Sequence, residues 1–186
     1  MAIGLRTRRF SVEEYYQMVR AGILKEDDRV ELIEGEIVEM TPIGPRHAVC
    51  VDGLTHRLVE ALGSRAVVRV QGPIALGPQS EPQPDLAVLR PPLTRYREAH
   101  PGPADLFLVV EVAETSVADD ARRKLPLSAR AGVREAWLVN LPAQTIEVHR
   151  GPTREGYQDV RTLGRGQRVA PEAFPDCTLT VDEILG

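Results

Sequence analysis

The sequence has little cysteine and no long apolar run. Its two cysteines, Cys50 and Cys177, lie far apart and outside any metal-ligand spacing, which argues against a disulfide framework and favours a reducing compartment. No apolar run approaches the roughly 20 residues that a helix needs to cross a bilayer. The basic segment 1–9 is not followed by the apolar stretch of a secretory signal peptide. We therefore expect a cytoplasmic protein.

The signatures of several enzyme classes are also missing. There is no Gly-rich phosphate loop ending in Lys-Ser/Thr, no Gly-x-Ser-x-Gly, no His-Glu-x-x-His and no Cys-x-x-Cys. His47 and His56 share one expected helix, but their spacing places them on opposite faces, so they are not an obvious ligand pair. These absences weigh against nucleotide hydrolases, serine hydrolases and structural zinc proteins.

An excess of positive charge is absent as well. The formal net charge is -4, so the chain as a whole does not attract a polyanion. A nucleic-acid role would therefore need a local basic surface, or metal ions that offset the acids. Arginines that could contact phosphates, or simply be solvated, stand at Arg90, Arg95, Arg97, Arg122 and Arg123.

What remains is the composition of a folded domain. The 186 residues are 42% hydrophobic and 27% charged, and this length suits one domain with a real core. Strand-like and helix-like patterns are mixed along the chain, which predicts an α/β domain with a central mixed β-sheet flanked by helices. We divide residues 1–186 into an N-terminal helix and hairpin (10–40), a core (45–141) and C-terminal strands (144–186).

Local signals predict the first elements. Ser11 and Glu14 form a capping box that starts a helix ending at Gly22. Glu34-Gly35, between two apolar runs, predicts a hairpin turn. A second helix is expected over 47–62. Its inward-facing residues would be Val51, Leu54, Leu58, Val59 and Leu62.

Further along, apolar runs bounded by turn residues predict strands. A helix is expected over 119–131, and Pro126 should either bend it or mark a fresh start. The segment 90–103 is proline-rich and is expected to be an exposed loop or short helix. The expected strands cover 66–70, 73–76, 86–89, 106–113, 135–141, 145–150 and 157–163, with one more strand and a terminal turn in the tail.

Two acids stand in or beside apolar strands. Glu111 lies inside the run 106–113, which is typical of a strand buried on both faces. A carboxylate buried there must be paired, protonated or bound to a cation, because an uncompensated charge costs several kcal/mol. Asp85, in QPDLAVL, leads directly into the next apolar strand. Asp120 and Lys124 are four residues apart and would share one face of the following helix.

These residue types favour oxygen chemistry. Magnesium takes carboxylates, backbone carbonyls and waters, so Asp85, Glu111 and the carbonyl of Val112 form a candidate ligand set. Such a metal would lower the pKa of a bound water, and Lys124 would hold that water or neutralise the transition state. Structural alternatives stay open: a Pro-Asp turn, a glutamate paired with a buried arginine, and a surface pair between Asp120 and Lys124.

The order of these motifs resembles the PD-(D/E)XK nuclease superfamily and, more closely, the Uma-two family of bacterial restriction-endonuclease-like proteins. The resemblance covers nearly the whole chain. It implies a restriction-endonuclease-like fold and Mg²⁺- or Mn²⁺-dependent hydrolysis of DNA phosphodiester bonds. The motifs that carry it are FSVEEYYQM, VELIEGEIVEM, the PIGPR loop before His47, QPDLAVLRP and LVVEVAETSVADDARRKLPLSARAGVREAWLVNL.

By this resemblance, Asp85 is the acid of the Pro-Asp element and Glu111 the acid of the (D/E)XK element. Ala113 stands where the lysine of that element is expected. The family places its lysine on the following helix, which corresponds to Lys124. Glu31 matches an upstream acid of the site, and would either complete the metal shell or be an ordinary charged strand residue.

The resemblance also bears on His47, Asp120 and Ser128. His47 matches a family histidine that would contact substrate phosphate or cap its helix, and Asp120 would support the site. The family usually has a tyrosine four residues after the lysine, where this chain has Ser128. If that tyrosine orients the lysine, activity would be weakened here.

Three hypotheses for function follow. The first is a metal-dependent endonuclease acting on DNA, for which a homodimer is plausible because two-fold symmetry suits the cutting of both strands. The second is a non-catalytic nucleic-acid-binding or regulatory module that retains the nuclease fold. The third is a structural protein whose acids are paired with arginines.

Overall fold

The computed structural model describes residues 7–25, 27–114 and 118–186, and for 118–122 it describes the backbone alone. Within these residues, short 3₁₀ turns cover 63–65, 93–96 and 103–105. The helices are α1 (Val12–Arg20), α2 (Pro45–Leu62), α3 (Ala118–Ala131) and α4 (Val181–Leu185). The strands are β1 (Val30–Ile33), β2 (Glu36–Glu39), β3 (Val67–Val70), β4 (Leu86–Leu89), β5 (Leu106–Ala113), β6 (Glu135–Asn140), β7 (Thr145–Pro152), β8 (Tyr157–Gly164), β9 (Arg168–Val169) and β10 (Leu179–Thr180).

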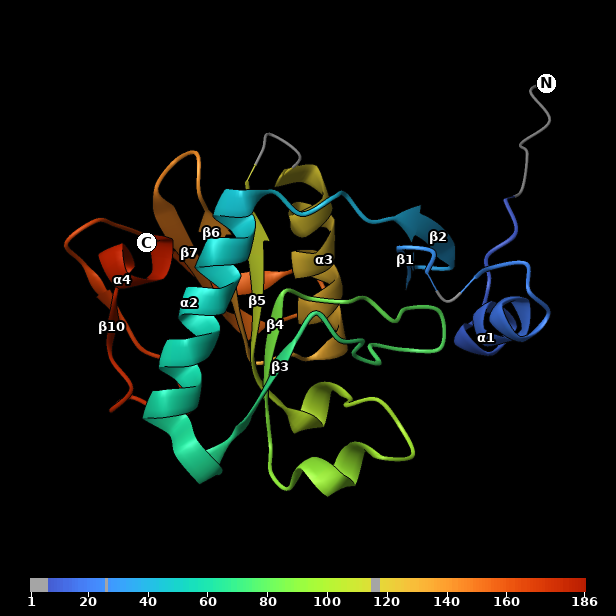
Figure 1. Cartoon of the computed structure of the whole chain (residues 1–186), viewed down its shortest axis with the longest axis horizontal. Coiled ribbons are helices and arrows are strands. Elements are labelled where there is room, and N and C mark those ends of the chain that lie inside the picture. The colour runs from blue at the N-terminus through green and yellow to red at the C-terminus, as the bar shows by residue number, and fades with distance from the viewer. Residues whose placement is uncertain (1–6, 26, 115–117) are drawn as a thin grey trace.

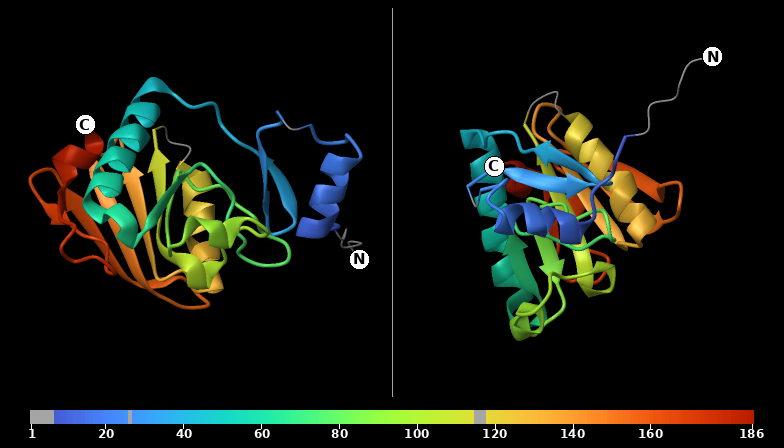
Figure 2. Two further views of the ribbon diagram at one scale, coloured as in Figure 1. Left: turned by 60° about the horizontal axis from the view of Figure 1, so that its bottom comes forward. Right: turned by 90° about the vertical axis from the view of Figure 1, so that its right-hand side faces the viewer.

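A six-stranded mixed sheet forms the centre of the molecule, with the strand order β3-β4-β5-β6-β7-β8. Only the β5–β6 pair within this sheet is parallel, and α3 forms the crossover between these two strands. Helices α2 and α3 lie on opposite faces of the sheet (Figure 2). The predicted α/β architecture is thereby confirmed, whereas the subdivision into three segments stays a prediction.

Strand β5 is buried on both faces, as its composition predicts. Leu108, Val110 and Val112 pack in the same cluster as the inner face of α2. The alternation of side chains along a strand turns Val109, Glu111 and Ala113 to the opposite face. Glu111 therefore points toward α3.

The N-terminal segment packs beside the central sheet rather than joining it (Figure 1). The Ser11–Glu14 capping box is present, and the hairpin turns at Glu34 and Gly35 with φ values of 50° and 79°. Both values are left-handed, as a tight hairpin turn between twisted strands requires. Gly35 also lies against the backbone of Arg9, where a Cβ would collide.

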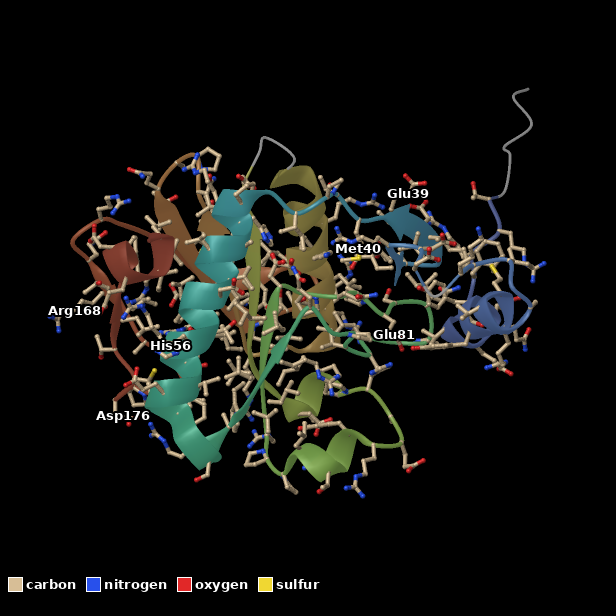
Figure 3. The ribbon with its side chains drawn as sticks, viewed as in Figure 1. Glu39, Met40, His56, Glu81, Arg168 and Asp176 are labelled. Atoms are coloured by element: carbon tan, nitrogen blue, oxygen red, sulfur yellow. The ribbon has the colours of Figure 1, made fainter. Side chains whose placement is uncertain are left out.

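The chain between β3 and β4 holds this N-terminal segment in place. Tyr16 of α1 donates a hydrogen bond of 2.5 Å to the buried carboxylate of Glu81, which Figure 3 labels near α1 and the hairpin. The backbone N–H of Gly35 donates to the carbonyl of Gln79 at 2.7 Å. Ile33 of β1 completes the attachment by packing in the apolar cluster on the α3 side of the sheet.

Several predicted elements differ from those observed. Helix α2 starts at Pro45, and Val59 is 53% exposed because it lies about 100° around the axis from the buried Leu58. Residues 73–76 form no strand, since their N–H groups bond to loop carbonyls such as that of Pro82. Helix α3 continues through Pro126.

None of the described helices is both long and apolar enough to span a bilayer. The cytoplasmic location expected from the sequence stays a prediction.

A buried ion pair connects β6 and β7. Glu135 is wholly buried, and its Oε1 accepts hydrogen bonds from Trp137 Nε1 at 2.8 Å and from Arg150 Nη2 at 2.7 Å. Its Oε2 accepts the backbone N–H of Glu172 at 2.6 Å. Removing one partner of such a pair leaves an uncompensated charge in the core.

We therefore expect Arg150→Met to lower the free energy of unfolding by about 3–5 kcal/mol in urea denaturation. Arg161→Met on β8 is the control, because its pair with Asp159 is exposed and should contribute less than about 1 kcal/mol. Adding Glu135→Gln to Arg150→Met should recover part of the loss. Equal effects of the two arginine substitutions would contradict this account.

Burial of His149 on β7 predicts a pH dependence of stability. Burial lowers the pKa of this imidazole below its ordinary value, although Glu147 acts in the opposite direction. As the pH falls, the unfolded chain therefore takes up a proton at His149 before the folded chain does. The contribution of neutral His149 to stability is present above the ordinary pKa and is lost as the pH falls through the lowered pKa of the folded protein. His149→Gln should weaken this loss of stability, measured by urea denaturation as the pH falls below the ordinary histidine pKa of about 6.5. His56→Gln, at an 82% exposed side chain, should leave the profile unchanged.

Candidate active site

The candidate site lies at the C-terminal end of β5, close to the N-terminal end of α2 and beside α3 (Figure 1). A pocket with a cavity volume of about 130 Å³ opens there. Met40, labelled in Figure 3 at the end of the hairpin, forms part of its wall. The sequence-predicted residues that line it are Glu31, His47, Asp85, Glu111, Val112 and Lys124.

Asp85 is fixed at the start of β4 by three contacts. Its Oδ2 accepts the backbone N–H of Val112 at 2.8 Å, and its Oδ1 lies 3.0 Å from Nε2 of His47. A longer contact of 3.4 Å comes from Gln71 Nε2. The carboxylate is thus held at the edge of β5 and remains 14% exposed to the pocket.

The contact with Asp85 also orients the backbone of Val112. In an extended strand, the N–H and C=O of one residue point to the same side. Because the Val112 N–H reaches Asp85, its carbonyl also points toward the β4 side. There β4 pairs with β5 only as far as Leu86 opposite Val110. The predicted backbone ligand therefore lies on the same side as the carboxylate of Asp85.

Lys124 reaches the site from α3 and lies between two acids. Its Nζ is 2.9 Å from Oε1 of Glu31 and 3.7 Å from Oε2 of Glu111. The side chains of Glu31, Lys124 and Glu111 are 0%, 7% and 8% exposed, respectively. The charges of these residues therefore interact in a poorly solvated environment, where electrostatic interactions are strong.

His47 contacts Asp85 rather than capping its helix. The N-cap of α2 is Gly44, and no side chain makes a capping hydrogen bond there. The hydrogen bond to Asp85 raises the pKa of His47, although burial acts against it. Of the two functions proposed for this histidine, contact with substrate phosphate is the one that stays a prediction.

Two of the positions compared by resemblance remain, Asp120 and Ser128. The side chain of Asp120 lies outside the described part of the chain, so its supporting role stays a prediction. Ser128 is buried one turn beyond Lys124. Within the described residues, no group of three or more histidine, cysteine, aspartate or glutamate side chains is placed to hold a metal ion.

The oxygen donors at the pocket match the requirements of a divalent cation. Asp85, Glu111 and the Val112 carbonyl provide oxygen donors alone, which is what Mg²⁺ and Mn²⁺ prefer. Magnesium usually keeps several waters and takes only one or two carboxylates, so two acids and a carbonyl on an open pocket are compatible with it. The residues present therefore fit such an ion.

Most of the predicted phosphate-contacting arginines are engaged within the protein. Arg95 pairs with Asp105 at 2.9 Å, and Arg123 pairs with Glu36 at 3.0 Å. Arg90 donates to the carbonyl of Ala104 and lies over the ring of Phe107. The side chain of Arg122 is outside the described part, and Arg97 lines a different pocket.

Several pocket residues gave no signal in the sequence. Arg29, Gln71, Gln83 and Glu114 all lie outside the regular strands and helices, and only the tertiary fold brings them together. Glu114 packs so closely on Gly44 that a Cβ there would lie 2.1 Å from its Oε2. Gly44 thus leaves room for an acid that follows β5.

Known proteins provide an independent comparison. A solved structure described as a putative nuclease belonging to DUF820, from Anabaena variabilis ATCC 29413, matches with a TM-score of 0.73. The match covers 95% of this chain and 97% of that chain at 15% sequence identity, so it shows a shared fold. No curated protein matches the sequence. The model of the Uma2 family, described as "Putative restriction endonuclease", matches residues 12–182, and the chain therefore belongs to this family.

Proposed function

We propose that this protein is a metal-dependent endonuclease that hydrolyses phosphodiester bonds of DNA. One observation carries the proposal: Asp85, Glu111 and Lys124, which come from three separate elements, line one pocket. Membership of a family described as "Putative restriction endonuclease", and a fold shared with a protein described as a putative nuclease, support it.

In this proposal, Asp85, Glu111 and the Val112 carbonyl hold Mg²⁺ or Mn²⁺. The bound ion would lower the pKa of a water and stabilise negative charge on the phosphoryl oxygen. Asp85 keeps the orientation given by the Val112 N–H, and His47 lies on its other oxygen. Binding of the ion would therefore compete with His47 for Oδ1 of Asp85.

Lys124 provides the positive charge that is missing from β5. Ala113, in the place expected for the lysine, is small and lines the same pocket. Lys124 reaches this space from α3, and its Nζ lies 3.7 Å from Glu111. There it can orient the attacking water or neutralise charge that develops in the transition state.

The second candidate is a nucleic-acid-binding or regulatory module without turnover. It is favoured by the contacts of Asp85, whose two oxygens already interact with His47 and Val112. The third hypothesis, in which the acids pair with arginines, applies to Glu135, which pairs with Arg150. The partners seen for Asp85 and Glu111 include a histidine, His47, and a lysine, Lys124.

Cleavage of supercoiled plasmid with Mg²⁺ or Mn²⁺ tests the proposal. Asp85→Asn and Lys124→Gln should each reduce the rate by about 100-fold or more, because one removes a metal ligand and the other a charge at the reacting phosphate. The matched controls are Asp52→Asn and Lys25→Gln at exposed positions, which should cleave like the wild type. An inactive wild type, across metals and substrates, would favour the binding module.

Metal binding can be measured without cleavage. Mn²⁺ at about 100 times its Kd should stabilise the wild type by about 2.7 kcal/mol, since a ligand that binds only the native state raises its stability. Asp85→Asn should lose this effect in thermal denaturation, while Asp52→Asn should keep it. Equal stabilisation of both variants would place the ion elsewhere.

A homodimer is part of the proposal, because two copies of the pocket could act on the two strands of a duplex. Sedimentation of the protein with and without duplex DNA tests this. A monomer in both conditions would restrict the activity to single cuts.

A further inference from the structure

We propose that Glu31 is a positioning residue that holds Lys124 for catalysis, so that the N-terminal hairpin forms part of the active site. This inference rests on the proposed nuclease function. It assigns Glu31 a role different from that of a metal ligand, which the sequence comparison had suggested.

Both carboxylate oxygens of Glu31 already contact the protein. Oε1 lies 2.9 Å from Nζ of Lys124, and Oε2 accepts the backbone N–H of Gln83 at 2.8 Å. The side chain is fully buried. The Gln83 contact fixes the direction of the carboxylate, and the shorter of the two Lys124 distances is the one to Glu31 rather than to Glu111. Glu31 is thus placed to hold the ammonium group by charge attraction.

The origin of the lysine explains why it needs such a partner. A lysine on β5 would be held close to the two carboxylates by the strand itself. Lys124 comes instead from α3 on a flexible four-carbon side chain with a compact charged end. The position of its Nζ is therefore set by the groups around it. Of Glu31 and Glu111, Glu31 makes the closer contact, at 2.9 Å against 3.7 Å.

The hairpin is docked on α3 by further ion pairs. Glu34 pairs with Arg130 at 2.6 Å, and Glu36 pairs with Arg123 at 3.0 Å. These two pairs are substantially exposed, so they are screened by solvent. The third pair, between Glu31 and Lys124, is buried and lies at the pocket. This difference makes Glu36 a matched control for Glu31. Both residues belong to the hairpin and pair with α3, but the pair of Glu36 is exposed and lies outside the pocket.

Steady-state cleavage at saturating Mn²⁺ tests the inference. Glu31→Gln keeps the size of the side chain and its ability to accept the Gln83 N–H. It should lower kcat about 10- to 100-fold, with KM for DNA and the affinity for Mn²⁺ changed less than about twofold. Glu36→Gln should have wild-type kinetics. In a Lys124→Gln background, Glu31→Gln should cause no further loss, because residues that act as a unit are not additive.

A second measurement does not depend on activity. Lys25 and Lys124 are the two lysines of the sequence, so selective isotope labelling of lysine gives side-chain NMR signals that are simple to assign. Glu31→Gln should shift or broaden the Lys124 signal and leave Lys25 unchanged, whereas Glu36→Gln should change neither. If Glu31→Gln does not fold, Glu31→Asp replaces it, because the shorter side chain withdraws the carboxylate and should act in the same direction.

The outcomes separate the two proposals. A lower Mn²⁺ affinity in Glu31→Gln, or a loss that persists in the Lys124→Gln background, would make Glu31 a metal ligand and overturn the positioning role. An unchanged Lys124 signal in an active enzyme would overturn it as well. A wild type that cleaves nothing would instead overturn the nuclease function, and with it any catalytic role of Glu31.

Discussion

The structure around the pocket depends on one constraint: Glu111 is a carboxylate on a strand that is buried on both faces. Such a charge is tolerated in a poorly solvated place only when other groups compensate it. Lys124 provides a positive charge from α3, and Glu31 of the hairpin shares that lysine. This compensation requires the crossover helix and the N-terminal hairpin to pack beside β5. Two acids and one lysine thus connect the consecutive elements β5 and α3 with a hairpin that lies far from them along the chain.

Glu135 shows how the same protein treats a buried acid that has no access to a pocket. It is wholly buried. Its oxygens accept hydrogen bonds from Trp137, Arg150 and the backbone N–H of Glu172. Glu111 and Asp85 are also shielded, yet both line an open pocket and contact groups that can exchange partners, a lysine and a histidine. Burial alone does not distinguish a structural acid from a candidate catalytic one. The distinction comes from solvent access and from the kind of partner.

The sequence predicted those features that have a local cause. The Ser11 capping box, the Glu34-Gly35 turn and the bounds of β5 follow from residues within one turn or strand. Asp85 and Glu111 could be found because an acid beside an apolar run is unusual. Val59 was predicted wrongly, because the sequence alone does not decide whether an apolar residue at the margin of a helix face is buried. The segment 73–76 was predicted wrongly as a strand, because its local sequence does not decide whether its N–H groups bond to a strand or to loop carbonyls. The contact between Glu31 and Lys124 has no local signal, because it exists only after the hairpin has docked.

In the proposed site, Lys124 provides from α3 the positive charge that the motif would place on β5. A water or phosphate at the pocket responds to the position of a charge, not to the number of residues between that charge and Glu111. Ala113 leaves the space on β5 open, and Lys124 occupies the same pocket from the helix. The rearrangement has a structural consequence. A charge that comes from a helix depends on the packing of that helix, so the site becomes linked to every element that fixes α3. Through Glu31, that dependence extends to the N-terminal hairpin, which pairs with no strand of the central sheet.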